Sequence, residues 1–195
     1  LIIAGGQIGG NKGRNLLRIV SETWNIPVAT AWRHQDLFNT NHPNFSCHLA
    51  FNMPPIFKDT LNESDLIIGI GTRLGDVVTQ GYKIPSAPQP IQKLIHIYND
   101  SKPLGNVFQT DLAIVADATK TLELIATINP PEVPKERLDW ISKAHALSAD
   151  RFKWEISKAS DGVPFGNIIA YIRDIADDDA ITTVDAGNFA TFVHR

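Results

Sequence analysis

Apolar residues in the first two thirds of the chain fall into short continuous runs, which are separated by polar, glycine-rich or proline-rich segments. Runs of this kind are typical of strands in a parallel sheet, because such strands are buried on both faces. The pattern predicts five strands, at residues 1–4, 26–30, 66–70, 92–98 and 112–117. Apolar residues at helical spacing predict helices that end near Trp24, Glu63 and Asn129. This alternation predicts an α/β fold, a doubly wound parallel sheet with helices on both faces.

Residues 65–82 show how such a strand would meet a ligand. The apolar run stops at Gly71 and gives way to a polar loop that contains Arg73 and Asp76. Binding groups in open parallel sheets gather just past the carboxyl ends of the strands, so we expect a cleft along that edge. Arg73 either pairs with Asp76 at the surface or binds a phosphate in bidentate fashion, and the residues alone leave both alternatives open.

The glycine-rich segment at residues 5–10 follows the first predicted strand and precedes a predicted helix. Such a turn can cradle a diphosphate, since it presents backbone N–H groups and the positive end of a helix dipole. The spacing G-x-G-x-x-G of nicotinamide-binding proteins is absent, and no acidic residue ends the strand at 26–30. A generic tight turn is an equally open interpretation of this segment.

A long loop is expected at residues 31–53. It carries His34, Asp36, His42 and His48, which invite the hypothesis of a metal site. No pair of histidines or cysteines there has the spacing of metal ligands, so this pattern disfavours a metal.

The last third of the chain is expected to form a second group of elements. Residues 129–136 contain three prolines and predict a semi-rigid linker between a domain at 1–128 and a region at 137–195. Helices are predicted at 137–157 and 164–175, and a strand at 180–184. Because the sequence begins without Met and stops inside a predicted helix, we expect it to be a piece of a longer protein.

Composition narrows the classes of partner. The net charge of −3 and the pI near 6.1 disfavour nucleic acid, which selects for basic surfaces. No apolar run approaches the roughly 20 residues that span a bilayer, which disfavours a membrane. The single cysteine, Cys47, excludes a disulfide within the chain and fits a reducing compartment, so we expect a cytoplasmic protein.

Four longer stretches together resemble one enzyme family. They are PVATAWRHQDLFNTNHPNFSCHLAF (27–51), GTRLGDVVTQGYKIP (71–85), KLIHIY (93–98) and DLAIVADA (111–118). Their combination resembles the central domain of thiamine-diphosphate-dependent enzymes of the acetolactate synthase and pyruvate oxidase group. The terminal stretch DAGNFATFVHR (185–195) is similar to the opening of the diphosphate-binding domain of that group. The resemblance implies a parent with three domains, of which this chain holds the middle one and the start of the third.

The resemblance also implies which residues contact cofactors. In relatives that bind FAD, the nucleotide lies along the carboxyl edge of the central sheet. The matching positions in this chain are Gly5, Gly6, Ala31, Trp32, Gly71, Thr72, Arg73 and Asp117. The positions that match contacts to the diphosphate of thiamine diphosphate are Gly187, Asn188 and Phe189. The activating glutamate and the metal motif of the family belong to other parts of the parent, so we expect no catalytic residue and no metal ligand here, and an inactive fragment.

Three positions depart from the flavin-binding relatives. Tyr98 stands where an acidic residue is usual, and Gly75 and Val77 stand where those relatives have acidic and basic groups. These departures disfavour tightly held FAD and leave ADP or an empty cleft as alternatives.

For the parent, the resemblance implies a homodimer or homotetramer that uses thiamine diphosphate and Mg²⁺ to act on a 2-keto acid. The alternative is a nucleotide-binding (FAD or ADP) or purely structural module without chemistry of its own.

Overall fold

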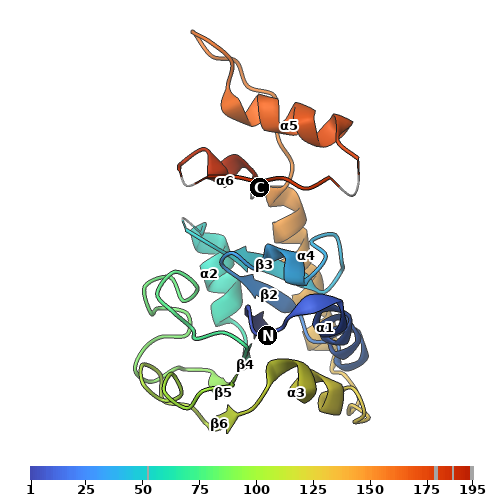
Figure 1. Cartoon of the computed structure of the whole chain (residues 1–195), viewed down its shortest axis with the longest axis vertical. Coiled ribbons are helices and arrows are strands. Elements are labelled where there is room, and N and C mark those ends of the chain that lie inside the picture. The colour runs from blue at the N-terminus through green and yellow to red at the C-terminus, as the bar shows by residue number, and fades with distance from the viewer. Residues whose placement is uncertain (52, 178–179, 186, 194–195) are drawn as a thin grey trace. The chain divides into compact units, whose positions relative to one another are not determined.

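The computed structural model describes residues 1–51, 53–177, 180–185 and 187–193 (Figure 1). Ala186, which lies in the predicted loop at 185–189, is outside the described residues. Contacts divide the chain into two compact units, Leu1–Ser148 and Ala149–Arg195.

The first unit is built on a sheet of six parallel strands in the order β3-β2-β1-β4-β5-β6. The strands are β1 (Ile2–Ala4), β2 (Val28–Ala31), β3 (Phe45–Leu49), β4 (Leu66–Ile70), β5 (Lys93–Tyr98) and β6 (Leu112–Val115). β1 and β4 lie at the centre, and β1 is fully buried because it has a strand on each side and a layer on each face. The predicted α/β fold with a parallel sheet is therefore confirmed.

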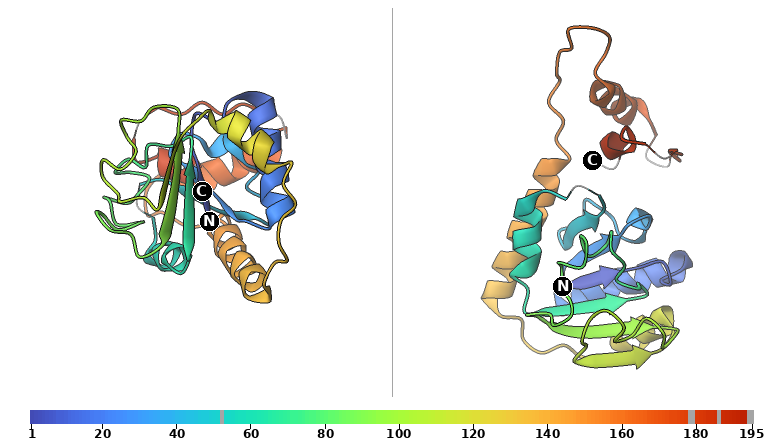
Figure 2. Two further views of the ribbon diagram at one scale, coloured as in Figure 1. Left: turned by 90° about the horizontal axis from the view of Figure 1, so that it is seen from below. Right: turned by 90° about the vertical axis from the view of Figure 1, so that its left-hand side faces the viewer.

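Helices cover both faces of this sheet (Figure 2). The helices of this unit are α1 (Gly10–Trp24), α2 (Pro55–Asn62), α3 (Ala118–Ile125) and α4 (Lys135–Arg151), and a short 3-10 helix, η1, spans Gln35–Leu37. α1 and α3 lie together on one face, where Lys12 pairs with Glu123 at 3.0 Å. α2 and α4 lie on the other face and are joined by an ion pair between Lys143 and Glu63 at 2.7 Å.

Two of the crossovers contain no helix and fill the core with loop side chains. The segments from β4 to β5 and from β5 to β6 are irregular. Their residues Leu74, Ile84 and Phe108 are nonetheless buried in the core cluster beneath α2, together with Leu61 and Leu94. Apolar side chains from these loops thus take the place of a helix face, because a parallel sheet must be covered on both sides.

The strand β3 was missed in the sequence, where it lies within the expected loop at 31–53. Its residues FSCHL alternate between apolar and polar, so they lack the continuous apolar run from which parallel strands were predicted. Its register against β2 shifts, so that Phe45 faces Val28 whereas Cys47 faces Ala29. The bulge in its pairing with β2 depends on both strands, so no pattern within residues 45–49 could have shown it.

Two further predictions need correction. The helix predicted at 137–157 ends at Arg151, because the segment after it turns to bond with the next helix: Nε1 of Trp154 and the backbone N–H of Ser157 both donate to Oδ1 of Asn167, at 2.9 and 3.1 Å. The strand predicted at 180–184 is not formed within the described residues, and its place in the diphosphate-binding domain stays a prediction.

The second unit contains the end of α4 and two helices, α5 (Phe165–Ile175) and α6 (Ala190–Val193). Rings of Phe165 and Phe189 contact edge to face, with centroids 5.9 Å apart. α4 begins at Lys135, inside the segment expected to be a linker, and the domain limits at 128 and 136 stay a prediction. In the described part of the chain, no helix combines the length and the apolar character that crossing a bilayer requires.

Candidate functional site: a cleft where the strand order reverses

The candidate site lies at the carboxyl ends of β1 and β4. From β1 the chain proceeds through β2 to β3 on one side, and then returns to the other side of β1 with β4. At such a reversal the two adjacent crossovers diverge over opposite faces and leave a crevice. A cleft of about 480 Å³ occupies this place and is lined by Gly5, Gly6, Gln7, Ala31, Trp32, His34, Gly71, Thr72, Arg73, Gly75, Asp76, Val77, Val78 and Tyr98.

Seven of the eight positions matched to a nucleotide cleft therefore come together, from the ends of β1, β2 and β4. The eighth, Asp117, does not line the cleft. It caps the N-terminus of α3, where its Oδ1 accepts from the backbone N–H of Lys120 at 2.8 Å. Any contact of these residues with a nucleotide stays a prediction.

The floor of the cleft is made by two loops whose backbones interlock. The N–H of Gly5 donates to the carbonyl of Ile70 at 3.0 Å, and the N–H of Gln7 donates to the carbonyl of Gly71 at 3.2 Å. Gly71 has φ of +67°, which residues other than glycine rarely adopt. A Cβ at Gly5 would lie 2.5 Å from the carbonyl oxygen of Gly71 and 2.5 Å from Cβ of Thr72. Glycines at 5 and 71 are thus needed for the loops to approach one another.

A buried histidine holds the second loop from below. His96 lies on β5 and is 2% exposed, and its Nε2 donates to the carbonyl of Thr72 at 2.8 Å. The same threonine accepts at Oγ1 from the N–H of Leu74, at 3.2 Å. Burial lowers the pKa of His96, although the bond to the Thr72 carbonyl opposes this effect. His96 is therefore a neutral group that fixes the position of the residue before Arg73.

This histidine gives the stability of the chain a testable dependence on pH. The unfolded state binds a proton at His96 near pH 6.5, whereas the folded state binds it only at lower pH. As pH falls below about 6.5, the unfolded state takes up the proton first and the free energy of unfolding decreases, by at most about 1.4 kcal/mol per pH unit. We expect His96→Gln, which keeps a donor and does not titrate, to lose less stability than the unchanged protein between pH 7 and pH 5.

Urea titrations at both pH values measure this difference. Carboxylates with lowered pKa values, such as Glu22 and Asp111, also lose stabilisation in acid, but they are common to both proteins and cancel in the comparison. Equal losses in the two proteins would contradict the assignment.

Gln7 ties the β1 loop to the end of β5. Its Nε2 donates to Oδ1 of Asn99, and its Oε1 accepts from the backbone N–H of Asn99 at 3.1 Å. Neither Gln7 nor His96 was singled out in the sequence. Their partners are 92 and 24 residues away along the chain, so no local pattern could have shown these contacts.

Trp32 lines the cleft at the end of β2 and is held by an aromatic contact outside the lining. The rings of Trp32 and Phe51 contact edge to face at 5.0 Å, and Cζ of Arg33 lies 4.2 Å from the centre of the Trp32 ring. Directly before Phe51, the carbonyl of Ala50 accepts from Nε2 of Gln80 at 2.8 Å, which ties the loop after β4 to the segment after β3. Both loops are thereby held in place around the opening.

Arg73 is exposed at the cleft. Among the described residues it forms no ion pair with Asp76, whose Oδ1 instead accepts from the N–H of Val77 at 2.8 Å. The surface pair considered from the sequence is therefore not formed. Binding of a phosphate by Arg73 stays a prediction.

The histidines of segment 31–53 serve separate purposes. His34 lines the cleft over Gly6, Nε2 of His42 donates to Glu22 at 3.0 Å, and His48 bonds to Oγ1 of Thr30 at 3.0 Å. Within the ranges that the structure describes, no three histidine, cysteine or acidic residues are grouped so that they could hold a metal ion.

The predicted contacts to thiamine diphosphate lie in the second unit. Gly187, Asn188 and Phe189 are exposed and precede α6. The backbone N–H groups of Asn188 and Phe189 donate to no other described residue, so this segment has donors to offer an anion. Contact with the diphosphate itself stays a prediction.

Comparison with known proteins adds a family to this geometry. Residues 1–125 match the model of the central domain of thiamine pyrophosphate enzymes. The chain is 26% identical over 188 residues to the acetolactate synthase large subunit of Parasynechococcus marenigrum (strain WH8102), and this match covers 96% of the chain and 30% of that protein. It is 33% identical over 132 residues to the acetolactate synthase isozyme 1 large subunit of Escherichia coli (strain K12), covering 65% of the chain and 21% of that protein.

A solved structure shows the same fold. It is the thiamine diphosphate-dependent 4-hydroxybenzoylformate decarboxylase of Rhodococcus jostii RHA1, which matches 93% of the chain and 32% of its own length with a TM-score of 0.62 and 20% identity. The chain thus spans about a third or less of the length of each of these proteins. From the family model and the parallel sheet together, we conclude that the chain belongs to the thiamine pyrophosphate enzymes and that residues 1–125 form their central domain.

Proposed function

We propose that the chain is part of an enzyme that uses thiamine diphosphate and Mg²⁺ to decarboxylate a 2-keto acid and to couple the product to an acceptor, as an acetolactate synthase does. The observation that carries this proposal is the match to the central-domain model at 1–125, together with sequence relatives that are named acetolactate synthases. When bound, thiamine diphosphate supplies the electron sink for the decarboxylation.

In this proposal the first unit is a scaffold and the second contributes to cofactor binding. The exposed N–H groups of Asn188 and Phe189 would donate to the diphosphate, and Gly187 would let the cofactor approach the backbone. The activating glutamate and the Mg²⁺ ligands would come from other parts of the parent, which we propose is a cytoplasmic homodimer or homotetramer. The chain alone is then inactive.

The full-length gene product tests this function. Purified with thiamine diphosphate, Mg²⁺ and pyruvate, it should release CO₂ and form 2-acetolactate, and omission of thiamine diphosphate should abolish both. The 195-residue chain is the matched control and should show no activity. If the full-length protein fails to bind thiamine diphosphate, the proposal is wrong. Release of an aldehyde without coupling would instead identify a simple decarboxylase.

We further propose that the cleft of the first unit does not hold FAD tightly. The three departures from flavin-binding relatives, Gly75, Val77 and Tyr98, all line the cleft. FAD bound there would therefore lack the charged side chains that those relatives offer it. Calorimetric titration of the chain with FAD, ADP and NAD tests this point. Tight binding of FAD would contradict it, binding of ADP alone would assign a nucleotide without flavin, and binding of none would leave a structural role for the cleft.

A further inference from the structure

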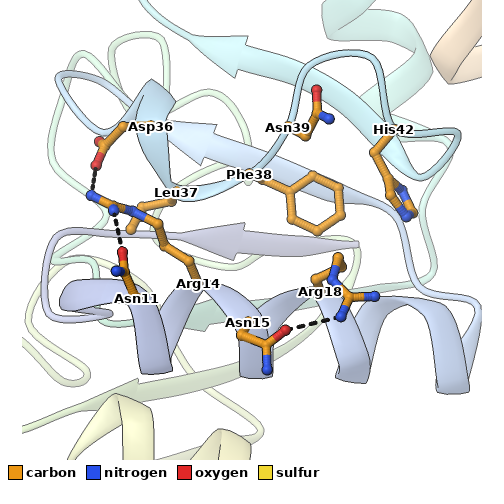
Figure 3. A pocket seen from close by; sticks show the side chains of 9 residues that line it. All are labelled: Asn11, Arg14, Asn15, Arg18, Asp36, Leu37, Phe38, Asn39 and His42. Atoms are coloured by element: carbon orange, nitrogen blue, oxygen red, sulfur yellow. Dashed lines mark hydrogen bonds and ion pairs between the residues drawn. The ribbon is translucent and has the colours of Figure 1, made fainter. Parts of the chain in front are cut away.

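A second groove of the first unit lies between α1 and the segment that follows β2, and Figure 3 shows the side chains that line it. The groove has a volume of about 290 Å³ and shares no lining residue with the cleft. Leu37 and Phe38 are part of its lining, and because each is only 4% exposed they contribute a small apolar surface beside the polar one.

α1 presents two arginines to this groove in a repeated arrangement. Oδ1 of Asn11 accepts from Nη1 of Arg14 at 3.2 Å, and Oδ1 of Asn15 accepts from Nη2 of Arg18 at 2.9 Å. Residues three and four apart in a helix lie on the same face, so the two guanidinium groups stand about one turn apart on one side of α1 (Figure 3).

Several donors of the polar lining have no acceptor among the described residues. The side-chain oxygens of Asn11 and Asn15 are taken by the arginines, and Oδ1 of Asn39 accepts from the N–H of Asn41 at 2.9 Å. The Nδ2 groups of these three lining asparagines donate to no described residue. Nε of Arg14 is buried and likewise finds no acceptor in the described part of the chain. A ligand that supplies acceptor oxygens would satisfy these donors.

Both arginines of the groove are in ion pairs that an anionic ligand can replace. Nη2 of Arg14 pairs with Oδ2 of Asp36 at 2.5 Å, and Nη1 of Arg18 pairs with Oε2 of Glu22 at 2.7 Å, and both pairs are exposed. Exposed pairs of this kind are weak, so an oxyanion can compete for the same guanidinium groups. The groove lining itself holds two arginines and one carboxylate. His42 accepts at Nδ1 from the N–H of Asn44 and donates from Nε2 to Glu22, so both of its ring nitrogens already have a partner.

We propose that this groove binds a small organic oxyanion, a carboxylate or a phosphate monoester. Arg14 and Arg18 bind its oxygens, the amide groups of the asparagines donate to it, and its apolar part packs on Phe38. Guanidinium groups match both carboxylate and phosphate geometry, so the two ligands share this chemistry. The site is independent of the proposed catalytic function, because none of its residues lines the cleft.

Titration of the ¹⁵N-labelled 195-residue chain, followed by NMR, tests this site. Phenyl phosphate and benzoate are the probes for the two kinds of oxyanion, inorganic phosphate lacks the apolar part, and benzamide lacks the charge. We expect saturable shifts of the amides at residues 11–18 and 36–42 with at least one of the first two probes, weaker binding of inorganic phosphate and no binding of benzamide. Tighter binding of phenyl phosphate assigns a phosphate monoester, and tighter binding of benzoate a carboxylate.

The variant Arg14→Gln/Arg18→Gln should weaken binding of the preferred probe at least tenfold. Lys12→Gln is the matched control, since Lys12 is also an exposed, carboxylate-paired cation of α1 but does not line the groove. Unchanged thermal unfolding shows that the variants are folded. Absence of shifts at these amides with both probes, equal affinity of the double variant and the control, or inorganic phosphate binding as tightly as phenyl phosphate would each overturn the proposal.

Discussion

Replacement of Gly5 by alanine is expected to lower the free energy of unfolding by about 3 kcal/mol, which is at the upper end of the cost of overpacking a core. The added Cβ would lie 2.5 Å from the carbonyl oxygen of Gly71 and 2.6 Å from Cα of Thr72. Both are backbone atoms of the neighbouring loop, so the clash cannot be relieved by rotation of a side chain. The loops must separate, and this weakens the bond from the Gly5 N–H to Ile70.

Gly75→Ala is the matched control for this substitution. Gly75 also lines the cleft, but a Cβ there meets no atom within 4 Å, and its φ lies outside the positive range. We expect its effect on stability to stay within about 0.5 kcal/mol. Chemical denaturation of both variants measures the difference. If Gly5→Ala proves as stable as Gly75→Ala, the interlocked loops are not as close as the structure places them.

These two glycines illustrate what the sequence can and cannot predict about the cleft. The strands that carry the site could be predicted because β1 and β4 are apolar runs that stop at glycine, and β5, after its first residue, is an apolar run interrupted only by His96. The carboxyl ends of parallel strands meet at one edge, and so the residues after them had to lie together. Which glycine is needed for close approach is a property of two loops at once, and only the structure distinguishes Gly5 from Gly75.

The groove at α1 shows a second limit. Arg14 and Arg18 lie in α1, where a spacing of four residues places them on one face. Which residues lie against these arginines depends on how the segment after β2 folds back onto α1. Asp36, which pairs with Arg14, is 22 residues away from it in the sequence. A metal hypothesis for the same segment was considered from its histidines. In the structure those histidines instead bond to Glu22 and Thr30 and line the cleft, which gives each a separate role.

The element that the sequence missed carries the last prediction. Phe45 begins β3, is 0% exposed, and pairs in register with Val28 of β2. Its carbonyl also lies 3.2 Å from Nδ1 of His145 on α4. If residues 45–49 were part of a surface loop, as the sequence suggested, truncation of this ring would cost little. Because the ring is buried in the first unit, we expect Phe45→Ala to lower the free energy of unfolding by about 3–5 kcal/mol.

Phe51→Ala is the matched control for Phe45→Ala, because Phe51 lies in the loop that follows β3 and not in the strand. Phe51 lies two residues beyond β3, is 55% exposed and contacts only the edge of the Trp32 ring among the aromatic pairs of the described residues. Loss of that contact should cost about 1 kcal/mol or less. Urea denaturation of the two variants, with the same chemical change six positions apart, then measures burial directly. Similar small losses for both would mean that residues 45–49 do not form a buried edge of the sheet, and the six-stranded order would have to be revised.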